Sequence, residues 1–107
     1  MIFYPLKGFE NLYFISKNST IKNADGLVLK PFLSSDNYKR ITLFKNNKKR
    51  NYYLHRLVAK QFLPNVENLK EVDHRDKNRQ NNNISNLRWT TRKENCNNKT
   101  NNLPKPN

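Results

Sequence analysis

The sequence has little of several residue types, and each shortage excludes a class of protein. Its single cysteine, Cys96, can build neither a disulfide framework nor a zinc site of several thiolates. No apolar run approaches the length of about 18 residues that a transmembrane helix needs. Residues 1–20 also lack the charged-then-apolar layout of a signal peptide. We therefore expect an intracellular protein that is not secreted and has no membrane partner.

Acidic residues are also scarce. The 107 residues include 8 Asp and Glu against 21 Lys and Arg, so the formal net charge is +13, and only 35% of the chain is hydrophobic. This length suits one domain with a small core, and the charge indicates a polyanionic partner, most simply nucleic acid. No acid occurs between Asn37 and Val66, where eight basic residues lie: Lys39, Arg40, Lys45, Lys48, Lys49, Arg50, Arg56 and Lys60. We interpret this stretch as a phosphate-binding surface, with a merely solvated face as the alternative.

The first half of the chain reads as short strands followed by a helix. Apolar runs predict strands at 12–15, 20–22 and 27–29, and a hairpin of 38–44 with 50–54 around a polar connection at 45–49. In that hairpin, Ile41 and Leu43 alternate with polar residues, as a strand with one buried face requires. A helix is then predicted from the apolar residues at helical spacing, ended by Pro64: Leu54, Leu57, Val58 and Phe62.

The last third combines two strands, a polar loop and a short helix into a ββα unit. Strands are predicted at 69–74 and 87–90, a surface loop at 75–83, and a helix at 92–98 after the capping box of Thr91 and Glu94. Such a unit can bring Asp73, His74 and Asn95 together. A carboxylate and an amide oxygen suit Mg²⁺ with its waters, and a nearby imidazole can take a proton from water.

These residues resemble the HNH endonuclease motif. The resemblance rests on residues 72–74, on Asn86 with Leu87 and Trp89, and on Glu94-Asn95. It is closest to the phage and intron-encoded homing subset, in which the last motif position is Asn (a His-Asn-Asn variant). Residues 55–65 are similar to the segment before the motif in that subset. Residues 4–9 look like a modular DNA-binding motif that often precedes such nucleases.

The resemblance implies a role for each matching residue. His74 would be the general base and Asn86 would hold the catalytic loop, although a neighbouring asparagine among 81–83 is an alternative for Asn86. Asp73 and Asn95 would bind the metal, which we expect to be Mg²⁺ with Mn²⁺ as the second candidate. The products would carry a 5′ phosphate and a 3′ hydroxyl. His55 reads either as a packing residue or as a supporting site residue.

The resulting prediction is an α+β protein of short antiparallel strands and a helix, followed by a ββα-metal nuclease core. We expect a β-rich DNA-binding region at 1–54, the nuclease core with its preceding helix at 55–98, and a tail at 99–107, forming one compact unit. The partner would be double-stranded DNA, bound by a monomer without a small-molecule cofactor. A non-catalytic nucleic-acid-binding module or degenerate nuclease is the alternative. The predicted DNA-binding residues are Lys39, Arg40, Lys45, Lys48, Lys49, Arg50, Arg56, Arg75, Lys77 and Arg79.

Overall fold

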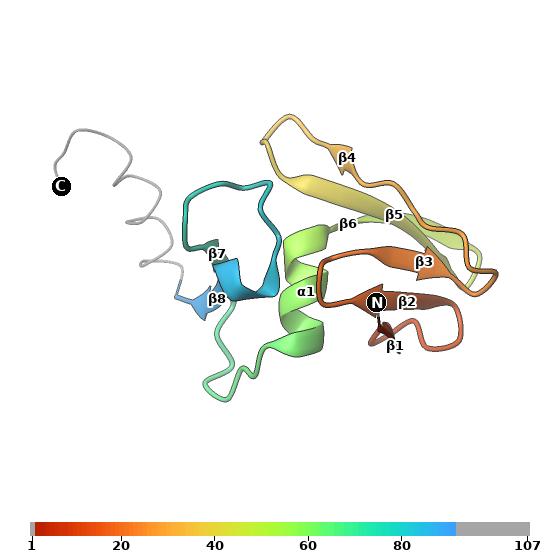
Figure 1. Ribbon diagram of the computed structural model, residues 1–107, viewed down its shortest axis with the longest axis horizontal. Coiled ribbons are helices and arrows are strands. Elements are labelled where there is room, and N and C mark those ends of the chain that lie inside the picture. The colour runs from red at the N-terminus through yellow and green to blue at the C-terminus, as the bar shows by residue number, and fades with distance from the viewer. Residues whose placement is uncertain (1, 92–107) are drawn as a thin grey trace, which may run out of the picture.

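Three small antiparallel sheets surround one α-helix in residues 2–91, the part of the chain that the computed structural model describes (Figure 1). This arrangement confirms the predicted α+β class. The first two sheets each have three strands in sequence order, and the third is a hairpin. The strands are β1 (Phe3–Pro5), β2 (Tyr13–Ser16), β3 (Ile21–Asn23), β4 (Phe32–Leu33), β5 (Lys39–Lys45), β6 (Lys48–Tyr53), β7 (Glu71–His74) and β8 (Leu87–Thr90).

The β5–β6 hairpin is longer and its turn tighter than predicted. The strands run to Lys45 and from Lys48, so only Asn46 and Asn47 connect them. Both asparagines have positive φ, 53° and 61°, which is the backbone of a two-residue turn that matches strand twist. Asparagine tolerates this conformation better than most residues, which explains the short turn. Ile41 and Leu43 are each 1% exposed and face the core, as their alternation predicts.

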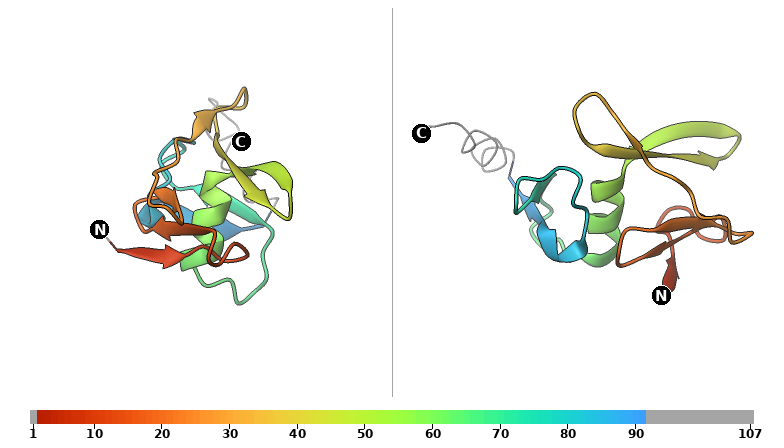
Figure 2. Two further views of the ribbon diagram at one scale, coloured as in Figure 1. Left: turned by 90° about the vertical axis from the view of Figure 1, so that its right-hand side faces the viewer. Right: turned by 45° about the horizontal axis from the view of Figure 1, so that its top comes forward.

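The helix α1 (Leu54–Phe62) follows β6 without a loop and lies between the third sheet and the first two (Figures 1 and 2). Its buried face carries Leu54, Leu57 and Val58. The helix ends at Phe62, and Leu63, the residue before Pro64, is already extended. The helix was therefore predicted correctly, and both the second sheet and the β7–β8 hairpin pack against it.

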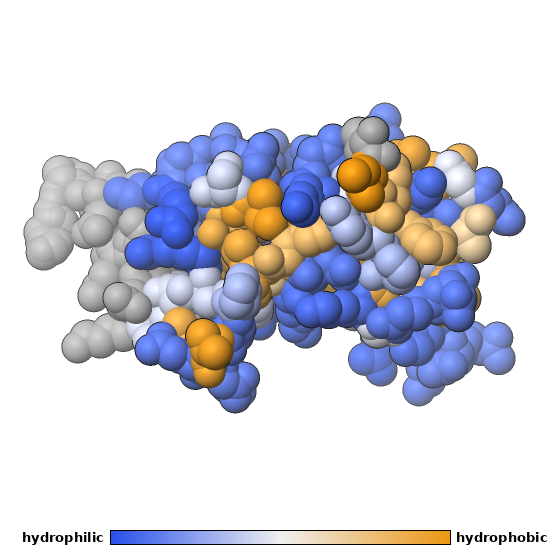
Figure 3. Space-filling view, turned by 60° about the horizontal axis from the view of Figure 1, so that its bottom comes forward, coloured by the Kyte–Doolittle hydropathy of each residue, from blue (hydrophilic) through white to orange (hydrophobic). Residues whose placement is uncertain are grey.

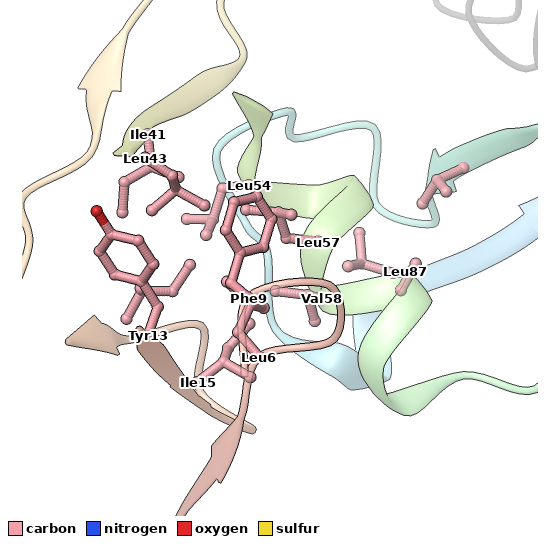
Figure 4. Packing of buried hydrophobic residues seen from close by; sticks show 13 residues of the cluster. Leu6, Phe9, Tyr13, Ile15, Ile41, Leu43, Leu54, Leu57, Val58 and Leu87 are labelled. Carbon is pink, nitrogen blue, oxygen red and sulfur yellow. The ribbon is translucent and has the colours of Figure 1, made fainter. Parts of the chain in front are cut away.

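One apolar core joins the two halves of the chain (Figure 4). It contains 13 buried residues, from Leu6, just after β1, and Ile15 in β2 to Val72 and Leu87 in the third sheet. Hydrophilic residues cover most of the face shown in Figure 3, with apolar ones in separate areas. In residues 2–91 no helix is long and apolar enough to cross a membrane. A functional division after residue 54 stays a prediction, and the expected tail at 99–107 lies outside the described residues.

Some local predictions were wrong. Residues 27–29 form no named strand, because only Val28 pairs, in an isolated bridge to Lys22. Strand β7 begins at Glu71 and not at residue 69. The loop at 75–83 is not wholly on the surface, since Asn82 is only 5% exposed, and it leads into a 3₁₀ turn, η1 (Ile84–Asn86). The predicted helix at 92–98, with Asn95 and Cys96, lies outside the described residues.

Candidate active site

The short hairpin β7–β8 carries the two predicted site residues next to each other. Asp73 pairs with Arg88 across the hairpin and His74 pairs with Leu87. Successive residues of a strand face opposite ways, so the carboxylate and the imidazole project to different sides. Both are buried nevertheless, each at 4% exposure. The imidazole of His74 lies against the rings of His55 from α1 and of Tyr38, the residue before β5.

The His74 imidazole is held by a hydrogen bond from its Nε2 to Oδ1 of Asn82, 2.8 Å away. An amide oxygen only accepts hydrogen bonds, so this contact places the ring proton on Nε2 and leaves Nδ1 as the basic nitrogen. Burial lowers the pKa of His74 below its ordinary value, against the opposing effects of the Asn82 bond and of the nearby carboxylates of Asp73 and Asp76. The neutral ring that results at neutral pH can accept a proton.

Asp73 lies on the other side of the strand, where Arg88 Nε donates to its Oδ2 at 3.0 Å. The side chain of Asp73 is 5% exposed and that of Arg88 is 40% exposed, so the ion pair links a buried carboxylate to the surface. Within residues 2–91 no group of three or more His, Cys, Asp or Glu side chains could hold a metal ion. A single hard carboxylate still fits a divalent cation that keeps several waters. Asn95, its predicted partner ligand, lies beyond the part of the chain that is described.

Asn86 closes the loop between the two strands. Its side-chain nitrogen donates to Oδ1 of Asp76 at 2.9 Å and to the carbonyl of Asn81 at 2.8 Å, while its oxygen accepts from the Asp76 backbone at 3.0 Å. Asn81 adds a bond to the second oxygen of Asp76 at 2.9 Å. These bonds lower the pKa of Asp76, and the bond from Asn81 has the largest effect. Asn86 thus joins Asp76 to Asn81 within the loop, and its role in the site stays a prediction.

A family model described as HNH endonuclease matches residues 52–97, the segment that contains α1, the hairpin and the loop. The chain contains an HNH endonuclease domain. It is 40% identical over 94 residues to DNA endonuclease I-HmuI of Bacillus phage SP01, a match that covers 87% of this chain and 54% of that protein. It is 42% identical over 89 residues to the uncharacterized HNH endonuclease L245 of Acanthamoeba polyphaga mimivirus, covering 83% of this chain and 27% of the relative.

A solved structure agrees with these sequence matches. The structure entitled "DNA binding and cleavage by the HNH homing endonuclease I-HmuI" superposes with a TM-score of 0.85 at 37% identity, covering all of this chain and 62% of that one. The HNH fold that the motif implied is therefore confirmed. The chain spans about half of the length of the I-HmuI protein. Asp73, His74 and Asn86 all lie inside the segment that the HNH family model matches.

The predicted DNA-binding residues of this HNH domain protein fall into two groups. Some make internal contacts: Arg40 donates to the Tyr53 hydroxyl at 2.7 Å, Arg56 to the Lys70 carbonyl at 2.9 Å, Arg79 to the Asp36 carbonyl at 2.9 Å, and Lys45 to the Gly8 carbonyl. Lys39 is half-buried. The remaining residues are exposed, and they are Lys48, Lys49, Arg50, Arg75 and Lys77. DNA contact by either group stays a prediction.

Sequence reasoning did not assign the contacts of three residues around the HNH site. Asn82 bonds His74, Arg88 pairs with Asp73, and the Tyr38 ring lies 5.8 Å from that of His74. Asn82 is the middle residue of three consecutive asparagines, so the sequence does not show which of them bonds His74. The charge of Arg88 opposite Asp73 was a usable signal, since pairing a short hairpin places the two side by side. His55, predicted as packing or supporting, is buried with its ring 4.9 Å from that of His74.

Proposed function

We propose that the chain is a divalent-metal-dependent endonuclease that hydrolyses phosphodiester bonds of double-stranded DNA, of the homing or mobile-element type. The observation that carries this proposal is the buried His74, whose Nε2 is bonded to Asn82 while Nδ1 remains basic, directly beside Asp73. A domain that only binds DNA needs no such imidazole. The relative I-HmuI, which is named a DNA endonuclease, supports the same conclusion.

The residues of the chain divide the work of hydrolysis. Nδ1 of His74 would take a proton from a water molecule, whose oxygen attacks phosphorus. The bond from phosphorus to the 3′ oxygen then breaks and that oxygen takes a proton from solvent water, which leaves a 5′ phosphate and a 3′ hydroxyl. Asp73, together with Asn95, would hold Mg²⁺ or Mn²⁺. A bound divalent ion stabilises negative charge on the phosphate and on the leaving oxygen. Asn86 would hold the loop in place, and with it Asn82, the hydrogen-bond partner of His74.

The basic surface would hold the DNA. Lys48 and Lys49 are exposed at the β5–β6 tip. No acidic residue occurs in the sequence between Asn37 and Val66 that could pair with these lysines in place of a phosphate. Each phosphate that such a residue neutralises steepens the slope of log affinity against log salt concentration by about 0.9. This contact positions the backbone and carries little sequence information. We propose that one monomer binds DNA in this way and needs no small-molecule cofactor.

A nicking assay on supercoiled plasmid tests the proposal. Cleavage is expected with Mg²⁺ or Mn²⁺ and is expected to stop with EDTA. His74→Ala should lower the rate by a factor of about 100 or more while DNA binding, followed by gel shift, is retained. Glu67→Gln, a substitution at an exposed residue outside the site, is the control for a side-chain change elsewhere and should cleave like the wild type. Absence of metal-dependent cleavage on any DNA, with binding intact, would instead establish a non-catalytic binding module.

A further inference from the structure

The rings of Tyr38 and His55 lie beside the His74 imidazole, and Tyr38 comes from the N-terminal half. Tyr38 stacks on His55 with ring centres 4.9 Å apart and planes at 23°. The same Tyr38 ring lies 5.8 Å from His74 at 36°, and the two histidine rings are 4.9 Å apart. Each ring therefore contacts the other two. Tyr38 directly precedes β5, His55 belongs to α1 and His74 ends β7.

The Tyr38 ring is itself held from its outer side. The guanidinium of Arg79, from the loop between β7 and β8, lies 4.9 Å from the Tyr38 ring centre and donates to the carbonyl of Asp36 at 2.9 Å. The carboxylate of Asp36 accepts from the Tyr53 hydroxyl at 2.8 Å, and Tyr53 packs edge-on against Tyr38. The turn before β5 is thus joined to the catalytic loop by side chains that fix the place of Tyr38.

The other partner of His74 also depends on the N-terminal half. The backbone carbonyl of Asn82 accepts a hydrogen bond from the hydroxyl of Ser19, which lies in the turn between β2 and β3. The segment that matches the HNH family model begins at residue 52, so Ser19 and Tyr38 both lie before it. His74 thus contacts Asn82, Tyr38 and His55, and of these Asn82 and Tyr38 depend on residues that lie before the HNH match.

We propose that Tyr38 is a positioning residue for His74. The torsion that turns an imidazole about its Cβ–Cγ bond has broad minima, so a single hydrogen bond leaves the ring plane poorly defined. The hydrogen bond to Asn82 fixes one atom of the ring, and contact with the tilted ring of Tyr38, which is itself stacked on His55, restricts the plane in which Nδ1 points. The consequence for cleavage rests on the function proposed above, whereas the effect on the ring itself does not.

Two substitutions at this position separate the ring from the hydroxyl, and a third is the matched control. Tyr38→Phe keeps the ring, and Tyr38→Leu removes it. Tyr52→Leu makes the same change at a half-buried tyrosine of the same hairpin, whose ring packs on Phe9 at 5.3 Å. Where Tyr38→Leu does not fold, Tyr38→Met replaces it, because an unbranched side chain fills irregular space. Thermal unfolding of every variant verifies that it is folded.

The first measurement is the tautomer of His74, from long-range ¹H–¹⁵N correlation spectra of the protein in EDTA. The wild type and Tyr38→Phe should show the Nε2-protonated ring alone, while Tyr38→Leu should show a mixture. The second is cleavage in Mg²⁺: Tyr38→Leu should lower kcat about 10- to 100-fold with KM for DNA unchanged, and Tyr38→Phe should stay within about threefold. Tyr52→Leu should alter neither kcat nor the His74 signal.

Opposite results would overturn the proposal. Tyr38 has no positioning role if Tyr38→Leu keeps both the tautomer and kcat, or if Tyr52→Leu reproduces its losses. Equal losses in Tyr38→Phe and Tyr38→Leu would transfer the role to the hydroxyl and contradict positioning by the ring. If the wild type cleaves no DNA, the proposed function fails, while the spectra still decide whether Tyr38 orients the ring.

Discussion

Arg88 Nε lies 3.0 Å from Oδ2 of Asp73, directly across the β7–β8 pairing. The relationship matters because the carboxylate is buried and a buried charge without a partner is costly. One oxygen of the predicted metal ligand therefore already has a cationic partner in the folded chain. Metal and guanidinium would share the negative charge of Asp73, which makes Arg88 a structural partner of the site.

Removing Arg88 should destabilise the fold. Arg88→Gln leaves the buried carboxylate of Asp73 with a weaker donor, and we expect the free energy of unfolding to fall by about 1 to 2 kcal/mol. The figure is toward the low end for such a loss, because the Arg88 side chain is 40% exposed and water screens the pair. Urea unfolding measures the change. Arg75→Gln, the same change at an exposed arginine of the loop, should have an effect near zero; equal losses in the two variants would contradict a specific pair.

Asn82 should matter for cleavage more than for DNA binding. Asn82→Ala removes the acceptor 2.8 Å from His74 Nε2, so the tautomer and the direction of Nδ1 are no longer fixed. We expect kcat to fall about 10- to 100-fold, the range found for residues that orient a catalytic or metal-binding histidine. Single-turnover cleavage and gel-shift titration measure the two effects separately. Gln80→Ala, an exposed neighbour in the same loop, is the control and should cleave normally.

Features of the fold and site that depend on neighbouring residues could be predicted from the sequence, whereas contacts between distant residues could not. Ile41 and Leu43 revealed a strand, and Pro64 a helix end, because these signals lie within a few residues of what they determine. Asp73 and His74 were identified through their motif. Asn82 could not be separated from Asn81 and Asn83, because the bonds of Asn86 to the loop decide which of the three turns inward. Tyr38 meets His74 only because the second sheet and the hairpin both pack against α1, which brings together residues 36 positions apart in a contact that no local pattern encodes.

The burial of His74 should make stability fall in mild acid. Its pKa is lowered in the folded state, chiefly by burial, whereas the unfolded chain takes up the proton near the ordinary value of about 6.5. The free energy of unfolding is therefore at its full value above that pH, and is lost as pH falls below it toward the lowered pKa of the folded state. Urea unfolding in EDTA between about pH 7.5 and 5 follows this loss.

His74→Gln is the matched variant for the pH experiment, since it keeps a side chain that can bond Asn82 and cannot titrate. His55 is present in both proteins, so the difference between their pH curves isolates His74. We expect the wild type to lose more stability than His74→Gln over the acidic part of the range. Parallel curves for the two proteins would show that protonation of His74 does not oppose folding.

Lys49 and Arg40 should behave differently although both were predicted to bind DNA. Lys49 is exposed at the hairpin tip, whereas Arg40 donates to the Tyr53 hydroxyl at 2.7 Å and lies 3.5 Å from the Asp36 carboxylate. Lys49→Ala should reduce the slope of log affinity against log salt by about 0.9, the loss of one phosphate contact. Its melting temperature should stay that of the wild type, while Arg40→Ala should melt several degrees lower because its internal contacts are lost. Fluorescence anisotropy with a DNA duplex over a series of KCl concentrations gives the slopes, and differential scanning fluorimetry gives the melting temperatures. An unchanged slope for Lys49→Ala would place the DNA away from the hairpin tip.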